Sequence, residues 1–483
     1  MAEEVELKLT VTDEAAAAIE ASGLLPGEVQ RVRQSSIYFD TADHALARSG
    51  SSLRIRKSGS QRVQTIKLAG ASTVGLFSRS EWERTVEDDS PILDANTPLL
   101  VILNGDVDAI APIFEVEIDR RIWTIVAEGA TIEMVLDRGH VAVGDRRSSI
   151  CEIELELKSG GSAALFAFAR RLDAVAPVRL GVLTKAERGY RLAGPVVTIV
   201  KADAVFLTAD MTAAQAFAII AQSCVRQFRL NETLYLAEGG AAALHQARVA
   251  LRRLRSAFSI FRPIIGVSGA ALTADLRWLA SELGEARNLD VLLARIRPGP
   301  LHDRVALARD AAHRRVAEVQ ALPRTRQLML DLAEWTARGG WSGSPEAADD
   351  DVQVGAFAIV ALDRCNRRAK KRGHHLARAD DAHRHEARKA AKKLRYAAEF
   401  FASLFTRKRE LARHDRFIAC LEALQDQLGA LNDLATAALL LEKLDVAADP
   451  EASRMTAGGS RRKRLAEAET AHLKLCAAKR FWR

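Results

Sequence analysis

The chain has 483 residues, of which 48% are hydrophobic and 27% are charged. At roughly 100–200 residues per domain this length predicts two to four domains, and the composition excludes a disulfide-stapled miniprotein and an intrinsically disordered chain. The net charge of +8 is unevenly distributed. Residues 1–200 carry 23 Lys and Arg against 29 Asp and Glu, a net −6, whereas residues 201–483 carry 47 against 33, a net +14. This asymmetry predicts two modules with different electrostatic roles.

The chain carries no signature of export or membrane insertion. Its five cysteines are far apart and form no CxxC pair, which argues against a zinc site or a disulfide framework and favours a reducing compartment. The N-terminal segment is acidic, and no run of 18 apolar residues occurs. We therefore expect a cytoplasmic location and no membrane partner.

The first module has the pattern of a β-protein. Apolar and charged residues alternate with period two over short segments separated by turn-like stretches, which predicts a largely antiparallel sheet or barrel. Two helical patches, at 12–20 and 162–174, interrupt the series. The predicted strands cover residues 4–9, 53–56, 63–68, 114–119, 132–137 and 153–158.

The second module has helical spacing. After Gly194 and Pro195 the chain becomes rich in Ala, Leu and Arg, with apolar residues three and four positions apart. We place the domain boundary near 195–210. A segment rich in Gly, Ser, Pro and Asp, Arg338–Asp351, predicts a linker that divides the helical part in two.

The two helical parts are related by an internal repeat. One stripe recurs at an offset of 140 residues: His245, Arg248, Arg252 and Arg255 become His385, Arg388, Lys392 and Arg395. Further along, Leu283 and Gly284 with Asn288 and Asp290 resemble Leu428 and Gly429 with Asn432 and Asp433. A duplicated helical unit explains both matches.

Nearly every predicted strand of the first module has one charged face. For a single strand this face can simply point to water. If the strands close into a barrel with helices outside, however, the charged faces line a wet interior. Arginines and lysines confined there require a polyanion, and clustered glutamates favour a hard divalent cation. The pattern therefore predicts a metal–polyphosphate site.

These residues carry a specific family resemblance. Glu4-x-Glu6-x-Lys8 resembles the ExExK signature of the CYTH family, the triphosphate tunnel metalloenzymes, whose fold is an eight-stranded antiparallel tunnel. An ordered set of further matches extends the resemblance over about 190 residues: Tyr38–Thr41, Arg54-x-Arg56, Thr65–Lys67, Glu152-x-Glu154-x-Glu156 and Thr184–Tyr190.

The resemblance implies roles for individual residues. It implies Mg²⁺ or Mn²⁺ bound by Glu4, Glu6, Glu154 and Glu156, with Glu81, Glu83, Glu133 and Asp137 as secondary carboxylates. It implies phosphate binding by Lys8, Arg54, Arg56, Lys67, Arg79, Arg120 and Lys185. The catalytic set is then Glu4, Glu6, Lys8, Glu154 and Glu156, and the implied reaction is in-line attack of water on a terminal phosphorus.

One position conflicts with simple alternation. Alternation over Phe114–Arg121 places Glu115, Glu117, Asp119 and Arg121 inside, whereas the resemblance selects Arg120. Either a β-bulge reconciles the two or Arg121 is the tunnel residue. The module's two histidines, His44 and His140, are expected to lie on the surface or in loops rather than to act as catalysts.

The repeated stripes place like charges on one helix face. Positions 245, 248, 252 and 255 lie within about 80° of one another, along about 15 Å of helix. Arg253, Lys389 and Lys393 flank the two stripes. Like charges at this spacing destabilise a bare helix, so their recurrence favours an anionic ligand over a merely solvated face. A metal at His374 and His375, or at His383 and His385, remains an alternative.

The stripes and the duplication resemble a CHAD domain, an all-helical module often fused to CYTH. This resemblance covers about 207–475 and implies binding of inorganic polyphosphate. The implied binding residues are His245, Arg248, Arg252, Arg255, His385, Arg388, Lys389, Lys392 and Arg395. Our domain prediction is 1–200 for the tunnel and 207–475 for the helical part, with repeats at about 207–337 and 352–475. The basic run Arg461–Arg464 lies outside the stripes.

We therefore expect a multidomain α+β protein: an eight-stranded antiparallel tunnel with outer helices, followed by an all-α duplicated bundle. The expected function is metal-dependent hydrolysis of inorganic triphosphate or related linear phosphates, with polyphosphate binding by the helical domain and association with polyphosphate granules. Alternatives are hydrolysis of nucleoside or thiamine triphosphate, adenylate cyclisation, and non-catalytic polyphosphate binding or granule targeting. Nucleic acid is not expected as the main partner, because aromatic residues are 5% of the chain and no stacking platform is evident.

Overall fold

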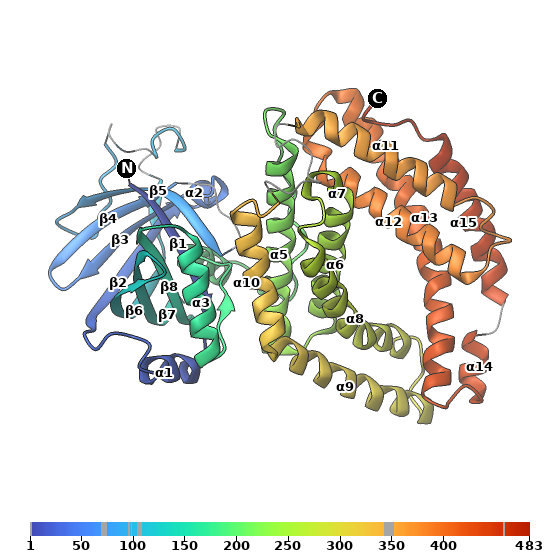
Figure 1. Ribbon diagram of the computed structural model, residues 1–483, viewed down its shortest axis with the longest axis horizontal. Coiled ribbons are helices and arrows are strands. Elements are labelled where there is room, and N and C mark those ends of the chain that lie inside the picture. Colours follow the sequence, from blue (N-terminus) through green and yellow to red (C-terminus); the bar gives the residue numbers. More distant parts are fainter. Residues whose placement is uncertain are drawn as a thin grey trace. The chain divides into compact units, whose positions relative to one another are not determined.

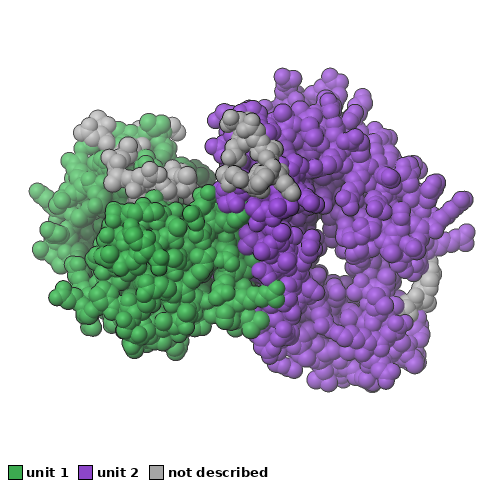
Figure 2. Space-filling view, viewed as in Figure 1, with its two compact units in different colours: residues 1–198, 321–338 green, residues 199–320, 339–483 purple. Residues whose placement is uncertain are grey.

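The computed structural model describes residues 2–68, 75–94, 97, 99–103, 109–341, 352–456 and 459–483. The chain forms two compact units (Figure 1; Figure 2). Unit 1 comprises Met1–Thr198 and Ala321–Arg338, and unit 2 comprises Ile199–Gln320 and Gly339–Arg483. Among the described helices, none combines the length and the hydropathy required to span a bilayer.

Unit 1 is built around one antiparallel sheet that closes on itself. The sheet order is β5-β4-β3-β2-β6-β7-β8-β1-β9, and a further pairing of β5 with β1 closes the barrel. The predicted tunnel of eight strands is confirmed, with a two-residue ninth strand added beside β1. The strands are β1 (Ala2–Thr10), β2 (Gln30–Thr41), β3 (Ser52–Ser58), β4 (Gln61–Lys67), β5 (Leu76–Thr85), β6 (Ile110–Ala127), β7 (Ala130–Val143), β8 (Arg146–Ser159) and β9 (Arg179–Leu180).

Alternation along the strands separates an apolar outer face from a charged inner face. Leu7 and Leu9 of β1 are fully buried on the outer side, and α3 (Ala163–Val175) packs against β1 and β8. The other outer helix, α1 (Asp13–Ala21), packs against α3 (Figure 1). Glu6 and Lys8, the alternate residues of β1, therefore point into the barrel.

Helix α4 (Lys185–Ala193) packs against the inward side of the barrel wall. It contacts β6 and β7, and its Ala186 and Tyr190 pack against a cluster that includes Phe114 of β6. A Cβ atom at Gly189 would lie 2.1 Å from the Phe114 ring, so this close approach requires glycine. A capping box of Thr184 and Glu187 starts the helix at Lys185, inside the barrel. A short helix, α2 (Ala45–Arg48), follows β2.

One helix of unit 1 comes from far along the chain. Helix α10 (Pro323–Ala337) packs against α3 and β9, and the buried Arg326 donates to Asp173 of α3 at 2.5 Å. Its helical spacing had predicted that this segment belongs to the first helical repeat. An amphipathic helix shows which of its faces is apolar but does not identify its partner, and α10 buries that face against the barrel unit.

Unit 2 is helical, and its two repeats have the same order of contacts. Helix α5 packs on α6 and α6 on α8, just as α11 packs on α12 and α12 on α13; α6 also meets α12, and α8 meets α13. Much of the predicted linker Arg338–Asp351 lies outside the described residues. The helices are α5 (Ala213–Glu238), α6 (Ala241–Ile260), α7 (Arg262–Ile265), α8 (Ala270–Leu293), α9 (Pro300–Ala321), α11 (Val354–Arg372), α12 (Asp381–Phe400), a 3₁₀ turn η1 (Ala402–Leu404), α13 (Lys408–Lys443), α14 (Pro450–Thr456) and α15 (Gly459–Ala477).

Candidate functional site

The barrel of unit 1 encloses a polar cavity of about 440 Å³, here called the tunnel. Its cations and carboxylates are almost equal in number among the described residues. Seven lysines and arginines line it, namely Lys8, Arg54, Arg56, Lys67, Arg120, Lys158 and Lys185. Six glutamates face them, namely Glu6, Glu81, Glu83, Glu133, Glu154 and Glu156.

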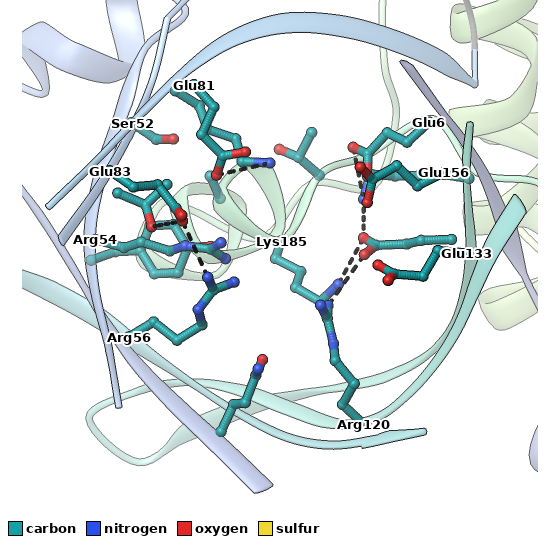
Figure 3. A pocket seen from close by; sticks show the side chains of 18 of the residues that line it. Glu6, Ser52, Arg54, Arg56, Glu81, Glu83, Arg120, Glu133, Glu156 and Lys185 are labelled. Atoms are coloured by element: carbon teal, nitrogen blue, oxygen red, sulfur yellow. Dashed lines mark hydrogen bonds and ion pairs between the residues drawn. The ribbon is translucent and has the colours of Figure 1, made fainter. Parts of the chain in front are cut away.

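Strand register places three of the carboxylates side by side. Glu6 of β1 is directly opposite Glu156 of β8, and Glu156 is directly opposite Glu133 of β7. Figure 3 shows these three side chains on one wall of the tunnel. Like charges directly opposite each other on neighbouring strands destabilise a sheet, so this row requires a nearby cation.

The next inward-facing residue of β1, Lys8, supplies one such cation. Lys8 lies opposite Glu154, donates a hydrogen bond to it, and has its Nζ 3.4 Å from Glu6 Oε1. Burial disfavours the ammonium form, but Glu154 and Glu6 outweigh it and raise the pKa of Lys8. Burial opposes the charge of Glu154, but Lys185, Lys8 and Arg120 hold its pKa well below the ordinary value. Both groups are therefore charged at neutral pH.

A second buried cation, Lys185, lies among three carboxylates. Its Nζ is 2.7 Å from Asp137 Oδ2, 2.7 Å from Glu152 Oε1 and 2.9 Å from Glu154 Oε1. These carboxylates form the group whose oxygens lie within 4.8 Å of one another, the one cluster with metal-ligand spacing among the described residues. Because the ammonium of Lys185 already lies among them, this buried triad is balanced by the chain itself. Burial opposes the charge of Lys185, but the carboxylates raise its pKa well above the ordinary value.

The sequence analysis did not assign a role to Glu152. It is almost fully buried, and it holds Lys185 while Arg188 approaches its other oxygen at 3.4 Å. Its place in the Glu-x-Glu-x-Glu run, with period two, was the signal that it faces inward. Its partners come from α4, and this pairing is not visible in the strand pattern.

Arg120 is the inward arginine of β6. Its Nε and Nη2 donate to the two carboxylate oxygens of Asp137 at 2.8 and 2.7 Å, and Nη2 also lies 3.3 Å from Glu154 Oε2. Arg121 instead pairs with Glu20 of α1, outside the barrel. No bulge is involved, since the β6–β7 register is continuous from residue 115 to residue 127.

The expectation that Glu115, Glu117 and Asp119 point inward is wrong. All three are exposed, because the apolar Phe114, Val116 and Ile118 occupy the inward face of β6. That face is apolar because α4 packs on it. The charged face of an isolated strand is thus not always the tunnel face.

The facing wall carries the paired arginines of β3. Arg54 Nη1 is 3.4 Å from Tyr38 Oη, and Arg56 Nη2 is 3.2 Å from Glu83 Oε1 (Figure 3). Arg54 is the main cause of the lowered pKa of Arg56, about 10, with burial second. Two neighbouring guanidinium groups that repel each other are suited to binding an anion. On β4, Lys67 Nζ lies 3.5 Å from Glu81 Oε1.

Four other residues considered from the sequence are not among the described residues that line the tunnel. Glu4 and Arg79 face each other in the register of β1 and β5, but their side chains lie outside the described residues. His44 sits in the turn before α2 with its ring against Tyr190, and His140 lies 3.8 Å from the exposed Glu117. Neither histidine is among the described residues that line the tunnel.

In unit 2 the two predicted stripes lie on α6 and α12, and their cations interact. The charge of Arg388 on α12 lowers the pKa of Arg248 on α6, and the charge of Arg252 on α6 lowers the pKa of Lys392 on α12. We define the basic cluster as His245, Arg248, Arg252, Arg287, Arg388 and Lys392. Burial and the neighbouring arginines lower the pKa of Lys392 to about 6, of His245 to about 4 and of Arg248 to about 10. The cluster is thus a set of basic groups whose charged forms repel one another.

The helix that follows each stripe contacts its histidine. Arg287 Nε of α8 donates to His245 Nδ1 at 3.1 Å, and Asn432 Oδ1 of α13 lies 3.0 Å from His385 Nδ1. Both contacting residues stand four positions after the repeated Leu-Gly pair, at Leu283 and Leu428. Sequence reasoning missed Arg287, although this spacing was the available signal.

The remaining predicted binding residues, Arg255, Lys389 and Arg395, are not part of the basic cluster. Arg395 pairs with Glu399 at 3.1 Å, and Lys389 pairs with Glu386. Arg255 is exposed at the far end of its stripe. The histidine pairs at 374–375 and 383–385 are not part of the cluster with metal-ligand spacing among the described residues.

Comparisons with known proteins match one family in each part of the chain, and the second matched range includes α10, which belongs to unit 1. Residues 2–190 match the CYTH domain and residues 219–442 match the CHAD domain. An inorganic triphosphatase of Haemophilus influenzae is 31% identical over 203 residues, which are 40% of this chain and 55% of that protein, so the chain spans about half of that relative's length.

Two solved structures are similar to parts of the chain. The CHAD domain of the plant Ricinus communis is 30% identical, with a TM-score of 0.51, over 57% of this chain and 96% of that one. A putative adenylyl cyclase of Hippeastrum is 19% identical, with a TM-score of 0.28, over 38% of this chain and 93% of that one. The chain is a two-domain protein in which a CYTH domain is joined to a CHAD domain.

Proposed function

We propose that the tunnel hydrolyses inorganic triphosphate, or a related linear phosphate, with a divalent metal ion. The observation that carries this proposal is the near balance of seven cations and six carboxylates on the tunnel walls. Cations alone would suit a bare anion and carboxylates alone a metal ion, whereas both together suit a metal complex of a phosphate chain. The similarity to a protein named inorganic triphosphatase supports this substrate class.

The carboxylate row fits a hard cation. Glu6, Glu154 and Glu156 would hold Mg²⁺ or Mn²⁺. We include Glu4 in the same set because it precedes Glu6 by two residues on β1. The direct opposition of Glu6 and Glu156 is the structural reason, because a cation between them offsets their repulsion. When bound, such an ion neutralises phosphate oxygens and lowers the pKa of a coordinated water.

The chain's own cations bind and orient the phosphates. Arg54 and Arg56 form the anion site on one wall, and Lys67 extends it. Arg120 and Lys185 are both held by Asp137 from the other side, so they face the tunnel without having to be ordered by substrate. In an in-line attack, water forms a bond to the terminal phosphorus as the bond to the leaving pyrophosphate breaks, and these cations offset the developing charge.

We further propose that the basic cluster of unit 2 binds inorganic polyphosphate, and that this binding associates the protein with polyphosphate granules. The supporting observation is that burial, and after it repulsion by neighbouring cations, lowers the pKa of His245, Arg248 and Lys392. A chain of phosphates would relieve this repulsion. Displacement of bound polyphosphate by duplex DNA at equal phosphate concentration would contradict this assignment.

A substrate panel on the full chain tests the catalytic proposal. Phosphate release is measured from inorganic triphosphate, ATP and thiamine triphosphate with Mg²⁺ or Mn²⁺, beside Glu154→Gln, Glu156→Gln and the exposed control Glu115→Gln. We expect fastest release from inorganic triphosphate and loss of activity in the two tunnel variants alone. Formation of cyclic AMP without phosphate release, or unchanged release in both tunnel variants, would overturn the proposal.

A further inference from the structure

Unit 2 contains a cavity that overlaps the predicted polyphosphate-binding residues only in part, at Arg252, Arg255, Lys389 and Lys392. Its volume is about 570 Å³, within the usual range of roughly 300–1,000 Å³ for small-molecule sites. It is lined by the second half of α6, by α7 and the start of α8, and by the neighbouring sides of α11 and α12. It shares only Arg252 and Lys392 with the basic cluster. We call it the α6–α12 pocket.

The pocket is strongly and one-sidedly basic. Eight arginines and lysines line it against a single glutamate among the described residues. That glutamate, Glu386, is already paired with Lys389. The other basic residues of the lining are Arg252, Arg255, Arg262, Arg277, Arg368, Lys392 and Lys393.

The contacts of these cations inside the protein are with neutral groups. Lys393 Nζ donates to Ser259 Oγ at 2.5 Å, and Arg252 Nε donates to Tyr396 Oη at 2.9 Å. Within the described part of the chain, Arg262, Arg277 and Arg368 lie in no ion pair. The positive charge of the pocket is therefore not neutralised by the protein.

The pocket cations also repel one another. Arg255 is partly exposed, and desolvation of the part that lies in the pocket, followed by the charge of Arg277, lowers its pKa. Burial likewise lowers the pKa of Lys393, and Arg368 adds to this effect. Because mutual repulsion opposes the charged forms, an anion in the pocket would gain electrostatic energy from several directions at once.

Charge balance separates this pocket from the tunnel. The tunnel presents seven basic residues and six carboxylates, which suits a phosphate together with a metal ion, whereas the pocket presents eight basic residues, one of them Lys392 with its pKa lowered to about 6, and one carboxylate. A polyanion can bind here without a divalent cation. A metal ion would instead meet a single carboxylate, Glu386, which is already paired with Lys389.

The shape of the lining favours a compact ligand. Residues of a single stripe follow one helix and suit an extended chain, but the pocket cations come from five helices and surround one space. Phe258, Ile265, Val267 and Ala270 form an apolar part of the lining. We infer that the α6–α12 pocket binds a compact ligand with several clustered phosphates, independently of a divalent metal and apart from the phosphate chain bound by the basic cluster.

Binding to the full chain, measured by calorimetry in EDTA at physiological salt, tests this inference. The probes are ATP and inositol hexakisphosphate, as two sources of clustered phosphates, and long-chain inorganic polyphosphate. The pocket variant is Arg262→Gln with Arg277→Gln. The matched control, Arg314→Gln with Arg416→Gln, removes the same charge from exposed positions of α9 and α13. The cluster variant is Arg248→Gln with Arg287→Gln.

We expect the pocket variant to weaken binding of at least one compact probe tenfold or more, and binding of polyphosphate less than threefold, while the control changes neither. The cluster variant is expected to show the reverse pattern. Failure of both compact probes to bind, equal binding by pocket variant and control, or loss of compact binding in the cluster variant would each overturn the inference. Since EDTA removes metal-dependent hydrolysis, these outcomes are independent of whether the tunnel is active.

Discussion

The fully buried carboxylate of Asp137 lies 2.7 Å from Lys185 Nζ and also binds Arg120 through both of its oxygens. Two cations that face the tunnel are thereby held by one residue of β7. Burial alone would raise the pKa of Asp137, but Lys185 and Arg120 lower it below its ordinary value. Both cations are therefore in place before any phosphate arrives.

Asp137→Asn is expected to impair catalysis through this positioning role. Loss of the charge leaves Lys185 and Arg120 to rearrange toward Glu152 and Glu154, and misplacement by about 1 Å can cost about 100-fold in rate. The decrease should appear in kcat more than in KM for triphosphate. The exposed Asp119→Asn on β6 is the matched control. Equal kinetics for the two variants would contradict the role of Asp137.

Glu156→Gln is expected to weaken metal binding. The substitution removes the central charge of the row that Glu6, Glu156 and Glu133 form across three strands. We expect at least a tenfold weaker affinity for Mn²⁺ in direct titration, with partial rescue of phosphate release at high metal concentration. Glu117→Gln, on the exposed side of β6, should bind as the wild type does. Wild-type Mn²⁺ affinity in Glu156→Gln would remove this residue from the metal site.

Polyphosphate binding is expected to strengthen as the pH falls from about 8 to about 6. Lys392 has its pKa lowered to about 6 by burial, by Arg252 of α6 and by Arg388 and Arg395 of α12, with Asp433 of α13 opposing them. A lowered pKa leaves the free lysine largely neutral above pH 6, and a bound polyanion raises that pKa, so binding takes up a proton. His245, with a pKa of about 4, adds to the effect at lower pH.

Lys392→Arg tests this coupling, since it gives the second stripe the residue that the first has at Arg252. It should bind more tightly at pH 8 and depend less on pH, and calorimetry in buffers of different ionisation enthalpy should show less proton uptake. The comparison with wild type cancels the titration of the ligand itself. Identical proton uptake by the two proteins would exclude Lys392 as the titrating group.

Arg326→Ala is expected to destabilise unit 1. Arg326 of α10 donates to Asp173 of α3, and both side chains are almost fully buried, so the substitution leaves a buried carboxylate without this partner. Such losses cost about 3–5 kcal/mol. Arg338→Ala, which removes an exposed pair with Glu334, should cost less than about 1 kcal/mol. Denaturant unfolding of the full chain measures both, and equal costs would contradict a supporting role for α10.

Much of the site followed from local pattern. Period-two alternation placed Glu6 and Lys8 on one side of β1 and Leu7 and Leu9 on the other, and helical spacing aligned His245 with Arg248. The same reasoning failed at β6, where the apolar face is the inner one because α4 packs on it. It also gave no reason to connect Arg287 with His245, since that contact joins two helices.

By itself the sequence determined the faces of the elements: which residues of each strand and helix are charged, which are apolar, and that two helical parts are copies. Periodicity is a local property, and each residue contributes to it independently of what packs on the element. Only the tertiary structure decided which face is inside, that α10 joins the barrel unit, and that Lys185 lies among Asp137, Glu152 and Glu154. These outcomes depend on pairings between residues far apart in the chain, and an element's own pattern does not encode its partner.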